Sequence, residues 1–181
     1  MALSPESGKR LVSIARHSLE AAVARRTVPD PEKLPEDLER PSGAFVTVFH
    51  QGALRGCLGR LEADQPLGKI VARLAASAAT EDPRFREERL APQDLPGVSL
   101  EVSVLSPLTR ARAEEVVTGR HGILVKRGRR SGCFLPQVAA EHGWDRERFL
   151  SVCCQDKAGL APDAWKDPAT EIWVFTSESF S

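Results

Sequence analysis

The feature that most constrains the fold is a stretch of eighteen residues or so that predicts a β-hairpin. Residues 44–50, AFVTVFH, alternate as a strand does, and residues 53–60, ALRGCLGR, form the returning strand. The two residues between them, Gln51 and Gly52, have the length and glycine content of a tight hairpin turn. The chain must therefore build an antiparallel sheet around this hairpin.

The returning strand places a cysteine among arginines and glycines. Side chains alternate between the two faces of a strand. We therefore expect Leu54 and Leu58 on one face, and Arg55, Cys57 and Gly59 on the other.

The remaining segments mix helices and strands. Helices are expected from Ser4-Pro5 to about residue 26 and at 66–80, 114–118, 138–142 and 145–156, and strands at 98–104, in a second hairpin around Gly128 and at 170–180. Residues 27–42 are rich in proline and predict an irregular surface loop. Because hairpins outnumber βαβ units, the expected class is α+β, with a mostly antiparallel sheet and flanking helices.

Composition narrows the functional classes. Lys plus Arg and Asp plus Glu are 25 each, so the net charge is zero and gives no support for binding to nucleic acid or membrane. The N-terminus is polar and no apolar run approaches a membrane span, which predicts a cytoplasmic location with reduced thiols. The four cysteines, at 57, 133, 153 and 154, have no C-x-x-C or zinc spacing, so neither metal nor cofactor is expected.

Seven motifs in this order resemble one family: GAFVTVF, LRGCLG, DPRF, LEVSVLSPL, HGILV, FLPQVAAEHGW and KAGL. The chain resembles the AMMECR domain family, whose prokaryotic form is called AmmeMemoRadiSam system protein A, from about Gly8 to Phe180. The resemblance implies a single domain over residues 1–181, with two lobes and a cleft between them that gathers the characteristic residues. It also implies two partners, a Memo-like protein and a radical SAM protein.

Cys57 has two interpretations. In the first it is a reactive thiol, because the Arg55 guanidinium on the same strand face favours the thiolate form. Gly56 and Gly59 would then let a ligand, or another part of the backbone, come close. In the second it is a buried structural cysteine, since free cysteines are among the most buried residues.

His121 and Glu101 are the candidates for proton transfer. His121 precedes Gly122 at a predicted strand start, and acts either as a general base for Cys57 or as a turn histidine that caps the preceding helix. Glu101 lies mid-strand between serines. It either orients the histidine, pairs with Arg55, or simply faces solvent.

Two further segments carry charge. Arg84 in DPRF either clamps a carboxylate or phosphate with its planar guanidinium, or belongs to a rigid turn begun by Asp82 and Pro83. Residues 126–130, KRGRR, are the only basic run. Without tyrosine and with few aromatics nearby for base stacking, the run fits a solvated hairpin tip better than a nucleic-acid site.

The leading hypothesis is an enzyme, or a subunit of one, that acts on a small anionic or carbonyl-containing molecule. Cys57 is its nucleophile or covalent attachment point, and Arg55 binds the anion and lowers the pKa of the thiol. His121 carries the proton, and Glu101 orients one of these side chains. The alternative hypothesis is a non-enzymatic binding or scaffold module for the two partners, recognisable by an exposed apolar patch.

Overall fold

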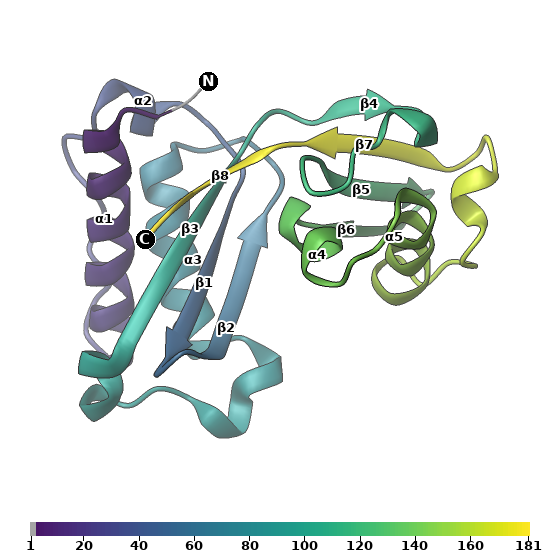
Figure 1. Ribbon diagram of the computed structural model, residues 1–181. Coiled ribbons are helices and arrows are strands. Elements are labelled where there is room, and N and C mark those ends of the chain that lie inside the picture. The colour runs from purple at the N-terminus through teal and green to yellow at the C-terminus, as the bar shows by residue number, and fades with distance from the viewer. Residues whose placement is uncertain (1–2) are drawn as a thin grey trace. The chain divides into compact units, whose positions relative to one another are not determined.

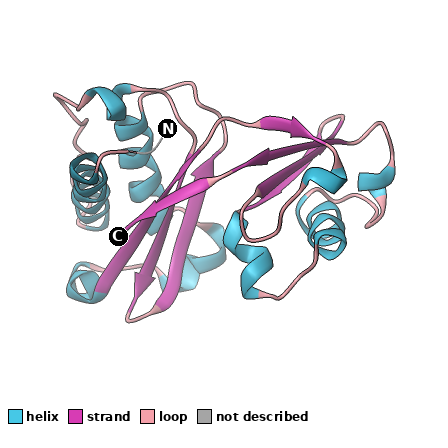
Figure 2. Cartoon of the chain, turned by 45° about the horizontal axis from the view of Figure 1, so that its top comes forward, coloured by secondary structure: helices cyan, strands magenta, loops and turns pink. Residues whose placement is uncertain are grey.

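The computed structural model describes residues 3–181, and the chain divides into two compact units. The first unit runs to Leu105 and also takes in Glu178–Ser181, and the second is Ser106–Ser177. Each unit has a four-stranded sheet and its own helices (Figures 1 and 2). The predicted α+β class with antiparallel pairing is confirmed.

The first unit is a sheet with helices on one face. Its strand order is β2-β1-β3-β8, with β1 Ala44–His50, β2 Ala53–Arg60, β3 Val98–Leu105 and β8 Ser177–Phe180. Its helices are α1 Pro5–Val23, α2 Glu36–Glu39 and α3 Leu67–Thr80, together with the 3₁₀ helices η1 Pro83–Glu88 and η2 Pro92–Gly97. The proline-rich loop thus contains one short helix, α2, and the charged segment after α3 contains η1.

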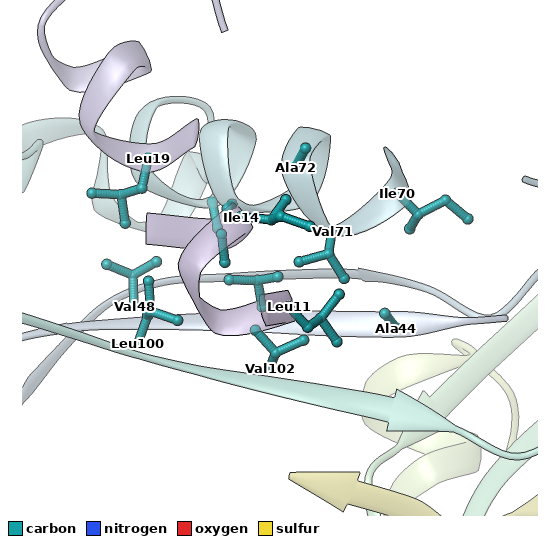
Figure 3. Close-up of a cluster of buried hydrophobic side chains, with 14 of the residues drawn as sticks. Leu11, Ile14, Leu19, Ala44, Val48, Ile70, Val71, Ala72, Leu100 and Val102 are labelled. Carbon is teal, nitrogen blue, oxygen red and sulfur yellow. The ribbon is translucent and has the colours of Figure 1, made fainter. Parts of the chain in front are cut away.

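The core of the first unit lies between α1, α3 and the helix-facing side of the sheet. Ser4 caps α1, since its side chain accepts a hydrogen bond from the Ser7 N–H at 3.1 Å. Figure 3 shows leucine, isoleucine and valine side chains of α1 and α3 packed on those of the strands. Alternation along β3 leaves Val98, Leu100 and Val102 buried.

The second unit repeats this arrangement with other elements. Its strand order is β4-β7-β5-β6, with β4 Thr109–Ala111, β5 Gly122–Arg127, β6 Arg130–Phe134 and β7 Glu171–Phe175. Its helices are α4 Pro136–Glu141 and α5 Arg146–Val152, with the shorter turns η3 Ala113–Glu115, η4 Cys153–Lys157 and η5 Ala164–Lys166. Phe149 and Leu150 of α5 are fully buried against Ile123 and Val125 of β5.

The sequence-based element boundaries hold best where a turn defines them. The first hairpin agrees at both strands, and the second turns at Gly128, whose φ of 60° suits glycine. The single strand expected over 170–180 is wrong, because Thr176 interrupts it and β7 and β8 join different sheets. Ser106 holds the break: its N–H donates to the Thr176 carbonyl, and its Oγ accepts from the Thr176 N–H.

Among the helices in residues 3–181, none has the length and apolar character needed to cross a bilayer.

Gly56 provides a test of how closely α3 packs on β2. A methyl group at this position would overlap the carbonyl oxygen of Ala78 in α3, which is backbone and has little room to move. We expect Gly56→Ala to lower the free energy of unfolding by about 3 kcal/mol in urea titrations. Gly52→Ala is the matched control, because Gly52 has open space around it and only its φ of 80° disfavours a side chain, so its cost is about 1 kcal/mol. Equal effects of the two substitutions would contradict the packing argument.

Candidate functional site

A β-bulge in β2 determines where the Cys57 side chain points. Pairing near the turn is regular, with His50 opposite Ala53 and Phe49 opposite Leu54, but the next pair is Val48 with Gly56. Arg55 is therefore an extra residue without a partner in β1. Had the regular register continued, Cys57 would lie opposite Val46, a fully buried core residue.

The bulge brings Cys57 to the face of the sheet that the helices of this unit leave uncovered. Cys57 lies opposite Thr47, whereas Val46 now lies opposite Leu58, which packs against the core. The prediction that Leu54 and Leu58 share a face is wrong for the same reason. Leu54 stays opposite Phe49 and is 36% exposed.

Three residues form a line across this open face, which we call the Cys57 row: Cys57 of β2, Thr47 of β1 and Glu101 of β3. Thr47 pairs with Cys57 on one side and with Glu101 on the other. The Thr47 Oγ1 and Cys57 Sγ atoms are 3.3 Å apart, within hydrogen-bonding range. The side chains of directly opposed strand residues are neighbours, so the register alone assembles this row.

Glu101 is held by hydroxyl groups. The Oγ atoms of Ser103 and Ser179 donate to its Oε1 at 3.4 and 3.3 Å, and the two hydroxyls are 3.2 Å from each other. Ser179 belongs to β8, so a residue almost 80 positions further along the chain completes this end of the row. Within residues 3–181 Glu101 makes no ion pair, neither with Arg55 nor with a histidine.

A buried carboxylate clamps the backbone of Cys57 at the sheet edge. β2 is an edge strand, and the Cys57 N–H and C=O point away from β1. Asp82 Oδ2 accepts from the Cys57 N–H at 2.9 Å, and Arg84 Nη2 donates to the Cys57 carbonyl at 2.9 Å. Together Asp82 and Arg84 supply the acceptor and the donor that a neighbouring strand would provide.

Asp82 and Arg84 also bind each other tightly. Arg84 donates to Asp82 through its backbone N–H at 3.1 Å, through Nε at 3.0 Å and through Nη2 at 2.7 Å. The hydrogen bond from the Arg84 side chain lowers the pKa of Asp82 from 3.8 to about 2, against the opposing effect of burial. The same bond raises the pKa of Arg84.

Arg55, the other candidate cation, is directed elsewhere. Its Nη1 donates to the carbonyl of Leu54 at 2.9 Å and lies 3.3 Å from Glu88 Oε2 in η1. Of the two arginines proposed from the sequence, Arg84 is thus the one bonded to Cys57, through its backbone carbonyl, and Arg55 is paired with Glu88.

Protein atoms fill the space beside Gly56 and Gly59, the two glycines that flank Cys57 in β2. The Ala78 carbonyl of α3 occupies it at Gly56, and the Phe45 ring occupies it at Gly59. Close packing accounts for these two residues without a ligand.

His121 belongs to the second unit, in the turn before β5. Its N–H donates to the Val117 carbonyl at 2.9 Å, and its Nδ1 accepts from the Val117 N–H at 3.2 Å. A neutral imidazole that accepts at Nδ1 carries its proton on Nε2. In this state His121 is a proton donor at Nε2, so its use as a general base first requires the bond to Val117 to open.

Two of the other three cysteines are more deeply buried than Cys57. Cys153 and Cys154 are fully buried, and burial raises the pKa of each thiol. Cys133, like Cys57, is half-buried. No group of three or more His, Cys, Asp or Glu side chains in residues 3–181 is arranged to hold a metal ion.

The basic run forms the tip of the β5–β6 hairpin. Arg127 pairs with Asp167 at 2.7 Å, and Arg130 donates to the Gly159 carbonyl at 2.9 Å. Two of its four basic side chains are therefore engaged within the second unit.

Comparison with known proteins identifies the family. The AMMECR1 family model matches residues 12–180. The chain belongs to the AMMECR1 family. The resemblance inferred from LRGCLG, DPRF and the other motifs is thereby confirmed.

AMMECR1 relatives match along nearly the whole chain. "Protein MK0488" of Methanopyrus kandleri is 41% identical over 191 residues, covering 98% of this chain and 89% of the relative. "Protein TK0174" of Thermococcus kodakarensis is 40% identical over 190 residues, with coverage of 98% and 91%. The crystal structure of uncharacterized protein PH0010 from Pyrococcus horikoshii matches with a TM-score of 0.89 and 35% identity, covering 98% of this chain and 92% of that one.

Sequence reasoning did not identify Thr47 or Ser179 as site residues, and it treated Asp82 as part of a turn only. Asp82 does cap η1, because it accepts from the Arg84 N–H, but it also clamps Cys57. Thr47 had one usable signal: it is the polar residue at the centre of an otherwise apolar strand, AFVTVF.

The clamp predicts a specific pH dependence of stability. The folded-state pKa of Asp82 is about 2, below its ordinary value of 3.8, so its stabilisation is complete above about pH 4 and is lost as the pH falls toward 2. We expect Asp82→Asn to lower the free energy of unfolding by about 2 kcal/mol at pH 7, and the difference from wild type to shrink between pH 4 and 2. Urea titrations across this range measure both effects.

Asp64→Asn serves as the control for this prediction. Asp64 also pairs with an arginine, Arg60, at 2.6 Å, but its side chain is 49% exposed, so its loss is expected to cost less than about 1 kcal/mol. A cost for Asp82→Asn that stays constant from pH 7 to pH 2 would refute the proposed clamp.

Proposed function

We propose that the protein is a small-molecule-handling enzyme, or a subunit of one, in which the Cys57 thiol reacts covalently with a carbonyl-containing ligand. The observation that carries the proposal is the bulge, which turns Cys57 out of the core and onto the open face of the sheet. The assignment of a Memo-like protein and a radical SAM protein as its partners rests on the family resemblance.

Two features of the surroundings of Cys57 support a reactive thiol. The sulfur lies 3.3 Å from the Thr47 hydroxyl, which can donate a hydrogen bond to a thiolate. The Cys57 backbone is fixed on its outer side by Asp82 and Arg84. A nucleophile held in this way loses little freedom when it reacts.

The proposed step is an addition. The Cys57 Sγ forms a bond to the carbonyl carbon of the ligand, and the π pair of that carbonyl moves to its oxygen. The thiol proton ends on the same oxygen, so the product is a hemithioacetal, and no oxidant or reductant is required.

The alternative, a scaffold that docks its partners through an apolar surface, has less support. Among the residues that the structure describes, Leu54 and Val117 are the only exposed large hydrophobic side chains, and they belong to different units. A docking surface of this kind calls for a contiguous apolar patch of several such residues.

Native-state alkylation tests the proposal directly. We expect iodoacetamide to modify Cys57 in the folded protein, because its side chain is only half-buried. The buried Cys153 and Cys154 should react only after unfolding, and Cys133→Ser removes the remaining half-buried thiol. Peptide mass spectrometry identifies the modified residue, and a Cys57 that labels only on unfolding would rule out a reactive thiol.

Turnover in the presence of the two proposed partners separates an enzyme from a scaffold. We expect Cys57→Ser to reduce small-molecule conversion, followed by mass spectrometry, on the order of a hundredfold or more. Cys133→Ser makes the same chemical change at an equally half-buried position and should leave conversion unchanged. Conversion by Cys57→Ser at the wild-type rate would favour the scaffold.

A further inference from the structure

The charges around Cys57 are unequally balanced. Arg84 is paired with Asp82 at 2.7 Å and Arg55 with Glu88 at 3.3 Å. Each pair is neutral overall, so neither arginine presents a full uncompensated charge to a ligand. The sequence suggested an anion-binding site on the strength of these two arginines, but both already have carboxylate partners.

Glu101 is the exception. It lies in the Cys57 row, half-buried, and makes no ion pair within residues 3–181. Its Oε1 accepts hydrogen bonds from two serine hydroxyls, whereas Oε2 accepts none from these residues. Because no cation among the described residues pairs with it, this carboxylate is suited to a positively charged partner from outside the chain.

The geometry of the sheet relates Glu101 to the thiol. Cys57 and Glu101 flank Thr47 on the two neighbouring strands, with all three side chains on one face. Two strand spacings separate their backbones by about 10 Å. The Cys57 sulfur is directed to Thr47, whereas Glu101 Oε1 is directed to Ser103 and Ser179, so a ligand of the row has to bridge the central strand, β1.

We infer that the ligand of the Cys57 row carries a cationic nitrogen, which binds the Glu101 carboxylate while the carbonyl carbon of the same ligand lies against the Cys57 sulfur. The substrate class is therefore an amino-carbonyl compound, with the amine and the carbonyl a few bonds apart. This inference rests on the proposed function, and it adds the charge that the ligand must have.

Charged thiol reagents of matched size test the inference. In the Cys133→Ser protein, Cys57 is modified by three methanethiosulfonates: trimethylammonium-ethyl, sulfonatoethyl and the neutral methyl compound. At about 10 mM ionic strength, where screening is weak, we expect the cationic-to-anionic rate ratio to exceed that of a small free thiol about fivefold. Glu101→Gln should abolish this excess, and high salt should reduce it.

Glu178→Gln is the matched control. This substitution removes the same charge at the residue before Ser179, and alternation along β8 directs the Glu178 side chain away from the Cys57 row. The cationic-to-anionic rate ratio should therefore stay at the wild-type value. No cationic excess in wild type, or an excess that survives Glu101→Gln, would overturn the inference. Failure of all three reagents, the neutral one included, would instead refute the proposed function, so the two failures are distinguishable.

Two-carbon aldehydes extend the test to reversible ligands. Aminoacetaldehyde, acetaldehyde and glyoxylate present the same aldehyde group with a cationic, neutral or anionic neighbour. We expect aminoacetaldehyde to protect Cys57 from iodoacetamide at the lowest concentration, and Glu101→Gln to remove its advantage over acetaldehyde. Better protection by glyoxylate would show that the site selects an anion, against the inference.

Discussion

The extra residue at Arg55 controls the chemistry available to the first unit. β1 has a strict division between Val46 and Val48, which are fully buried, and Phe45, Thr47 and Phe49, which face away from the helices. Any residue of β2 shares the environment of its partner in β1. By inserting one residue between Leu54 and Gly56, the bulge exchanges these environments for the rest of β2. Gly56 then faces α3, where only a glycine fits, and Cys57 faces outward.

The clamp from Asp82 and Arg84 follows from the same geometry. A bulged edge strand leaves unpaired N–H and C=O groups, which either attract another strand or need to be covered. Here one carboxylate and one guanidinium cover the pair belonging to Cys57. Because Asp82 also begins η1, the polypeptide just after α3 is fixed to the strand that α3 packs on. The packing of Gly56 and the clamping of Cys57 are therefore parts of one local structure.

The sequence predicted the features that short-range patterns encode. The two-residue turn at Gln51 and Gly52 defined the first hairpin, and Ser4-Pro5 defined the start of α1. The bulge was not predictable in this way, because Leu54 and Leu58 have the even spacing of an unbroken strand, although the bulge places them on opposite faces. Glu88, which pairs with Arg55, comes from η1, and Ser179, which donates to Glu101, comes from β8. These contacts depend on segments that are distant in the sequence. The break at Thr176 depends on Ser106, seventy residues earlier in the chain.

An arginine close to a cysteine in the sequence is often taken as a sign of thiol activation. In this fold, each arginine near Cys57 forms an ion pair, so its charge has to be considered together with that of its carboxylate partner. Arg55 is two residues from Cys57, yet it is balanced by Glu88, and Arg84 is balanced by the more deeply buried Asp82. What distinguishes this face of the sheet is Glu101, whose partners within residues 3–181 are hydroxyl groups. A thiol and an unpaired carboxylate on either side of one threonine favour a ligand with an electrophilic carbon and a cationic nitrogen. The pairing of charges around the site, more than the presence of arginines, thus determines which molecules it is suited to bind.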